Sequence, residues 1–244
     1  MNPSLLALGL LLYNLSKVLS SFRLNLCFRD YDVVLSTKDN LVLYYIGMFY
    51  NLFLPGGIGG DAYKVWLLRQ NGFGETNHLV RSVLFDRISG MMMLGVLGLT
   101  LGWVSFPDIP YRYLLVFAAV ITIPGFYILT LLFAKQLLKS FFKTTILSLG
   151  VQGLQIFCAL AILTGLGVED HILVYVTVFL ISSLVSVLPI SVGGIGIREL
   201  VFVAAAGFWP ISQDVSVAFS LLFFLLTALS SLPGGILSTR WAKK

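Results

Sequence analysis

Residues 51–64, NLFLPGGIGGDAYK, and residues 187–200, VLPISVGGIGIREL, have the same plan. Each runs from apolar residues through a proline and the tetrapeptide Gly-Gly-Ile-Gly into a charged segment. Glycine permits sharp turns and close backbone approach, whereas proline ends a helix. Each stretch therefore predicts a tight reversal between two short helices.

The composition places these reversals in a membrane. Of the 244 residues, 58% are hydrophobic and 11% are charged, and the mean hydropathy is +0.94. A soluble domain carries about 25% charged residues, so this chain cannot cover a water-facing surface. We therefore expect an all-α polytopic membrane protein. In such a protein Lys and Arg mostly determine which loops are cytoplasmic. The net charge of +5 therefore does not indicate a nucleic-acid partner, and none is expected.

Apolar segments long enough to span a bilayer occur five times, since a crossing helix needs about 20 residues. They are 3–21, 83–104, 112–134, 144–166 and 214–238. Two further apolar regions, 40–70 and 172–206, are interrupted by the Gly-Gly-Ile-Gly stretches. Irregular backbone at membrane depth is tolerated only inside protein or beside a wet cavity. We interpret both regions as re-entrant helical hairpins.

Lys and Arg indicate how the chain crosses the membrane. They occur in 22–39, 62–82, 135–143 and the C-terminal residues, and are missing from 105–111, 167–171 and 207–213. Basic loops are cytoplasmic, so we expect the N-terminus outside, the C-terminus cytoplasmic, and hairpins that enter from opposite sides. The same rule predicts Lys17 and Arg23 on the cytoplasmic side of the first apolar run. Lys64 is interpreted as an interfacial residue or one that pairs only to hold helices together.

The layout is also an inverted repeat. Units of about 3–104 and 144–238 each contain a helix, a hairpin and a second helix, and helix 112–134 joins them. Aligning the two Gly-Gly-Ile-Gly stretches pairs Asp61 with Arg198. Inverted repeats with broken helices meeting at the midplane are a transporter architecture. We expect one transmembrane domain over 1–244, and interpret LPGGIL at 232–237 as a helix end.

The candidate site lies where the two hairpin tips meet. A half-helix N-terminus carries free N–H groups and partial positive charge, which suit a phosphate. Charged residues in apolar segments usually pair or line a wet path, but the adjacent Asp86 and Arg87 point about 100° apart and cannot pair with each other. The expected lipid headgroup-binding residues are Gly56, Gly57, Gly59, Gly60, Asp61, Asp86, Arg87, Gly193, Gly194, Gly196, Arg198 and Glu199. No catalytic residue, metal site or cofactor is expected.

Three stretches carry a resemblance to a known family: GMFYNLFLPGGIGGDAYKVWLL at 47–68, SVLFDRISG at 82–90 and LPISVGGIGIREL at 188–200. They resemble signature regions of the lysylphosphatidylglycerol synthase transmembrane, or flippase-like, family, over about residues 11–238. The resemblance implies a multi-pass protein of a bacterial or archaeal plasma membrane. It is related to the half of the bifunctional members that moves aminoacylated phosphatidylglycerol between leaflets. Their soluble aminoacyl-transferase domain is missing here, so no enzyme activity is expected.

The leading functional hypothesis is a translocase that moves a phospholipid or polyprenyl-linked lipid without ATP. Arg87 and Arg198 are its expected counter-charges. One alternative is an accessory membrane subunit that presents lipid to a separate glycosyl- or aminoacyl-transferase. Another is an ion-coupled small-solute transporter, which proton-binding carboxyls at Asp61, Asp86 and Glu199 would favour. The candidate partners are thus a membrane lipid as substrate, a second copy of the chain and a separate transferase.

Overall fold

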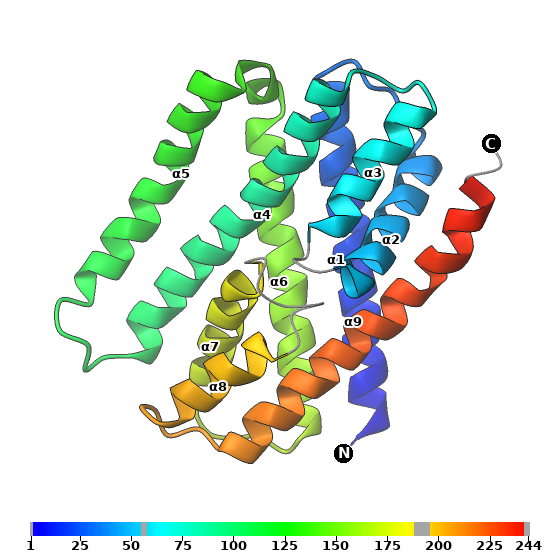
Figure 1. Ribbon diagram of the computed structural model, residues 1–244. Coiled ribbons are helices and arrows are strands. Elements are labelled where there is room, and N and C mark those ends of the chain that lie inside the picture. The colour runs from blue at the N-terminus through cyan, green and yellow to red at the C-terminus, as the bar shows by residue number, and fades with distance from the viewer. Residues whose placement is uncertain (1, 55–57, 188–195, 242–244) are drawn as a thin grey trace.

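The computed structural model describes residues 2–54, 58–187 and 196–241, and within these ranges the secondary structure is helical (Figure 1). The elements are α1 (Pro3–Arg29), α2 (Thr37–Phe53), α3 (Gly59–Gln70), α4 (Thr76–Ser105), α5 (Tyr113–Phe133), the 3₁₀ helix η2 (Lys135–Lys139), α6 (Phe141–Gly165), α7 (Ile172–Val185), α8 (Ile197–Ala206) and α9 (Gln213–Trp241).

Five of these helices, α1, α4, α5, α6 and α9, are long and apolar enough to cross a membrane. They correspond to the five predicted spans, so the prediction of an all-α multi-pass membrane protein is confirmed. The helices α1 and α4 extend furthest beyond the predicted bounds, since α1 continues to Arg29 and α4 begins at Thr76. Hydropathy misses these ends because they carry polar and basic residues, which helices accommodate where they leave the apolar region.

Shorter helices occupy the two interrupted regions. The helices α2 and α3 pack against each other, as do α7 and α8. In Figure 1 the two pairs extend from opposite ends of the bundle and approach each other near its middle. This arrangement fits the two predicted hairpins, while their entry into a membrane from opposite sides stays a prediction. The glycines Gly56, Gly57, Gly193 and Gly194 lie outside the described residues.

Along the described part of the sequence, four helices precede α5 and four α-helices follow it, and in each group two short helices lie between two long ones. This order runs from α1 to α4 and again from α6 to α9, which matches the predicted units in length and order. The N-terminal end of α1 and the C-terminal end of α9 lie at opposite ends of the bundle (Figure 1). The inverted symmetry between the two units stays a prediction.

Local sequence explains where the helices begin. The Asn2 side chain accepts a hydrogen bond from the Ser4 N–H at 3.1 Å, and Ser36 accepts one from Asp39 N–H at 3.0 Å, so each satisfies a donor at a helix start. At the start of α8, Gly196 has φ = +84°, a conformation that favours glycine. Its N–H donates to Glu199 Oε2 at 2.7 Å.

Glycines at the start of α3 permit tight packing. A Cβ on Gly60 would collide with the Gly47 carbonyl oxygen of α2, and one on Gly59 would collide with Leu54. The Gly60 N–H donates to Asn51 Oδ1 at 2.8 Å. The absence of side chains therefore lets α2 and α3 approach backbone to backbone.

The sequence LPGGIL does not mark a helix end, so that interpretation was wrong. Helix α9 continues through it with Pro233 inside. A Cβ on Gly234 would collide with the Tyr45 carbonyl oxygen, and one on Gly235 would lie 2.8 Å from the Phe49 ring. The two glycines instead let α9 cross α2 closely, which is a common use of small residues between membrane helices.

Two clusters of buried apolar residues form the core. One contains Phe179 of α7 and Phe202 of α8, and the other contains Leu43 of α2 and Leu68 of α3. Each pair of short helices therefore packs against long helices through its own apolar cluster. This packing fixes the positions of the polar residues at the inner ends of the short helices.

Charge divides the connections between helices as predicted. The basic residues Arg29, Lys38, Lys135 and Lys139 lie at or near the end where α1, α3 and α5 finish. At the opposite end, the connections hold Asp108, Glu169 and Asp170, together with one cation, Arg112. The asymmetry supports the predicted topology, although the orientation in a membrane stays a prediction.

Candidate functional site

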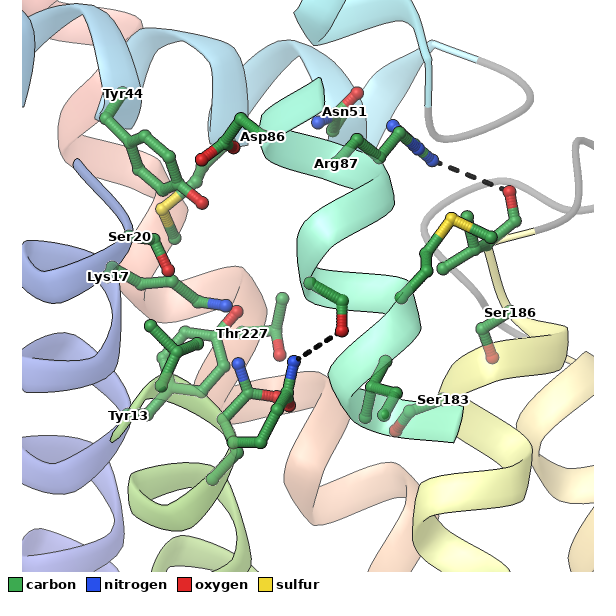
Figure 2. A pocket seen from close by; sticks show the side chains of 18 of the residues that line it. Tyr13, Lys17, Ser20, Tyr44, Asn51, Asp86, Arg87, Ser183, Ser186 and Thr227 are labelled. Carbon is green, nitrogen blue, oxygen red and sulfur yellow. Dashed lines mark hydrogen bonds between the residues drawn. The ribbon is translucent and has the colours of Figure 1, made fainter. Parts of the chain in front are cut away.

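A cavity of about 320 Å³ lies among the inner ends of the short helices. Its described lining comes from every α-helix except α5. Figure 2 shows polar side chains from several helices around it, among them Lys17 from α1 and Arg87 from α4. The charged lining residues are Lys17, Arg23, Asp61, Lys64, Asp86, Arg87 and Arg198.

Asp61, in the first turn of α3, binds two cations. Its Oδ1 accepts from Lys64 Nζ at 2.8 Å, and its Oδ2 accepts from Arg87 Nη1 at 2.6 Å. Arg87 Nη2 also lies 3.5 Å from the carbonyl oxygen of Val187, just after α7. Arg87 on the long helix α4 therefore contacts both pairs of short helices.

Asp86 belongs to a second, more deeply buried ion pair. Its Oδ1 accepts from Arg23 Nε at 2.7 Å, and the two side chains are only 8% and 5% exposed. Arg23 Nη1 also donates to Ser148 Oγ at 2.9 Å, which ties α1 and α4 to α6. The prediction that Asp86 and Arg87 do not pair with each other is confirmed, because they bind different partners.

Lys17 and Arg198 line the same cavity in a different way. Lys17 Nζ lies 4.4 Å from the ring centroid of Tyr13, and the Arg198 guanidinium lies 4.6 Å from that of Phe223. Among the described residues, neither forms an ion pair with a carboxylate. The buried Arg198 Nε has no hydrogen-bond partner within the part of the chain that the structure describes. Aromatic rings attract these cations but do not neutralise them.

The structure brings together some of the expected site residues and not others. Asp61, Asp86, Arg87 and Arg198 share the cavity. Glu199 does not line it, because its carboxylate caps the start of α8. Gly59, Gly60 and Gly196 shape the helix starts beside the cavity without lining it, and the remaining four glycines lie outside the described residues.

Three cations that line the cavity, Lys17, Arg23 and Lys64, were not among the expected site residues. Lys17 and Arg23 lie within α1, and the buried Lys64 pairs with Asp61. Loop-charge counting treats each cation alone, whereas Arg23 and Lys64 pair with carboxylates inside the bundle. The spacing of Asp61 and Lys64 by three residues was a usable signal for one pair. The Arg23–Asp86 pair spans 63 positions and left no local signal.

The lining therefore contains five cations and two carboxylates among the described residues, a surplus of three positive charges when all are ionised. Such a surplus attracts an anion, and Arg and Lys are the side chains that bind phosphate oxygens. The described residues contain no cluster of three or more His, Cys, Asp or Glu that could hold a metal ion. Anion binding is thus the chemistry that these groups can provide.

Comparison with protein families identifies the family of the chain. The family model described as "Lysylphosphatidylglycerol synthase TM region" matches residues 1–143 and 133–234, and these segments include all seven charged lining residues. Neither the comparison with curated proteins nor that with solved structures gives a match. The family match confirms the resemblance seen in the sequence: the chain belongs to the lysylphosphatidylglycerol synthase TM region family.

Proposed function

We propose that this protein is a flippase-like lipid translocase that moves a phospholipid or polyprenyl-linked lipid across a bacterial or archaeal plasma membrane without ATP. The N-terminus lies outside and the C-terminus in the cytoplasm. One observation carries the proposal. Residues from both pairs of short helices, Lys64 and Arg198 among them, line a single cavity with a surplus of positive charge.

The position of the cavity supports lipid movement. The long helices are spanning candidates, and the short pairs approach each other between them (Figure 1). Residues of both short pairs line the cavity. A headgroup held there would lie at membrane depth, with its acyl or prenyl chains free to stay among lipids. Broken helices that meet at the midplane are a recurrent basis for alternating access.

The carboxylates make ion coupling the weaker hypothesis. Asp61 accepts from Lys64 and Arg87, and Asp86 accepts from Arg23. Glu199 binds the backbone N–H at the start of α8. Each of these three carboxylates already has a cationic or N–H partner. The surplus of positive charge on the lining suits a lipid phosphate, so we favour lipid translocation.

The test is lipid translocation by the purified protein. Proteoliposomes containing fluorescent phosphatidylglycerol or, separately, fluorescent phosphatidate would be compared with protein-free liposomes, and loss of fluorescence to an external reductant would report movement between leaflets. Faster loss in the presence of the protein supports the proposal. Lipid binding without any movement would instead favour the accessory subunit that presents lipid to a separate transferase.

A further inference from the structure

The charges that line the cavity remain unbalanced after every ion pair is counted. Asp86 balances Arg23, whereas Asp61 is shared by Lys64 and Arg87. Among the described residues, Lys17 and Arg198 have no carboxylate partner. The surplus is therefore spread over the cavity walls, on α1, on α8 and around Asp61.

Uncompensated charge at membrane depth is costly. A bound headgroup that cancels more of the surplus is held more tightly. A diester phospholipid such as phosphatidylglycerol carries one negative charge and leaves about two positive charges unbalanced. A phosphate monoester carries about −1.5 to −2 near neutral pH, and a diphosphate carries more.

The hydrogen-bonding groups point to the same chemistry. Arg198 Nε and Ser183 Oγ are buried without a hydrogen-bond partner in the described ranges of the chain, and both residues line the cavity. Each can donate to a phosphate oxygen. A terminal phosphate presents three strong acceptor oxygens, whereas a diester presents two. Buried donors normally find partners, so these two atoms suit a phosphate headgroup, while the surplus charge favours the one with more negative charge.

One acceptor in the cavity lining suits a hydroxyl. Gln152 Nε2 donates to the Gly90 carbonyl oxygen at 3.2 Å, which fixes the orientation of its amide. Its Oε1 is buried and has no hydrogen-bond partner among the residues that the structure describes. A hydroxyl on the headgroup can donate to it, and so can the P–OH of a partly protonated monoester.

We infer that the cavity selects lipids whose headgroup ends in a phosphate monoester or diphosphate over diester phospholipids with a single negative charge. The inference rests on the proposed function only in taking this cavity as the headgroup site. It also disfavours aminoacylated phosphatidylglycerol, because a lysyl group adds positive charge to a cavity that already has an excess.

The test compares two lipids that differ by one methyl group and one charge. Dioleoyl phosphatidate has a terminal phosphate, and dioleoyl phosphatidylmethanol is its methyl diester. Binding to the purified full chain would be measured by native mass spectrometry and by the shift in melting temperature with lipid concentration. We expect phosphatidate to bind about tenfold more tightly. Equal affinities would overturn the inference.

Substitutions in the cavity test whether it causes the preference for phosphatidate over phosphatidylmethanol. In Lys17→Gln and Arg198→Gln, the ratio of the two affinities should fall to about threefold or less. The exposed Lys143→Gln and Arg81→Gln are matched controls and should keep the wild-type ratio. A wild-type ratio in both cavity variants would overturn the assignment to this site. The comparison of the two lipids on the wild-type protein stands even when a variant does not fold.

Competition with inorganic phosphate and pyrophosphate tests whether the cavity binds a lipid headgroup or a free anion. We expect them to displace phosphatidate only at concentrations at least about a hundredfold above that of the lipid, because they lack the acyl chains. Displacement at equal concentration would overturn the lipid assignment.

In liposomes, equal movement of both lipids would contradict the selectivity but leave the translocase intact. Selective binding without movement would contradict the translocase and support the selectivity.

Discussion

Arg87 on α4 donates to Asp61 on α3 across 2.6 Å. The same guanidinium lies 3.5 Å from the Val187 carbonyl oxygen at the end of the other short pair. Asp61 in turn accepts from Lys64 at 2.8 Å. A single carboxylate therefore holds two cations at the point where both pairs of short helices approach α4.

Removal of that carboxylate should destabilise the protein. Asp61→Asn keeps the side-chain shape but leaves Lys64 and Arg87 without their shared anion, and breaking a buried pair costs on the order of 3 kcal/mol. We expect a clear fall in melting temperature in detergent. The exposed Asp108→Asn is the matched control and should melt like the wild type. Identical melting of all three proteins would contradict a structural role for the pair.

Close packing between α2 and α3 depends on Gly60. In Gly60→Ala the new methyl group would meet the Gly47 carbonyl oxygen, and such overpacking costs about 1–3 kcal/mol. Gly95 in α4 has nothing within 4 Å of its Cβ position. Gly95→Ala should therefore leave stability unchanged or raise it slightly, since alanine favours helix. The measurement is thermal unfolding in detergent, and a Gly60→Ala protein as stable as Gly95→Ala would refute the close approach.

Connections at the same end of the bundle should lie on the same side of the membrane, which cysteine labelling can test. Asn71 and Gln136 are exposed near the basic end, and Asp108 and Ser212 are exposed at the other. Single cysteines at the first two positions should react only from the cytoplasm, and at the other two only from outside. The native Cys27 and Cys158 are fully buried, which keeps the background low. Labelling of positions 71 and 136 from opposite sides would exclude the paired arrangement of α2 and α3.

Much of the fold could be predicted because its signals are local. Spans, breaks and loop charges are properties of contiguous residues, and they gave the five long helices and two interrupted regions. The interpretation of LPGGIL was wrong because Pro and Gly suit both a helix end and a close helix crossing. Only the contacts of Gly234 and Gly235 with α2 distinguish the two.

The site could be predicted only in part. Asp61, Asp86, Arg87 and Arg198 stood out as charges in apolar segments, and the cavity contains all four. Lys17 and Arg23 follow the apolar start of the first segment, so they resembled residues that set orientation in the membrane. Only the full extent of α1 shows that both residues line the cavity. Glu199 looked like a site residue, but its carboxylate bends back to the start of its own helix.

Lys17 and Arg198 test the central claim most directly. Neither forms an ion pair with a carboxylate among the described residues, so neutralising them leaves no buried anion behind and should preserve the fold. Lipid translocation in proteoliposomes would be measured for the double variant Lys17→Gln/Arg198→Gln, beside Lys143→Gln/Arg81→Gln at exposed positions. Each lost charge–phosphate contact costs about 1.5–3 kcal/mol, roughly ten- to a hundredfold. We predict at least tenfold slower translocation for the cavity variant and the wild-type rate for the control. A folded cavity variant that moves lipid at the wild-type rate would contradict the claim that this cavity carries the headgroup.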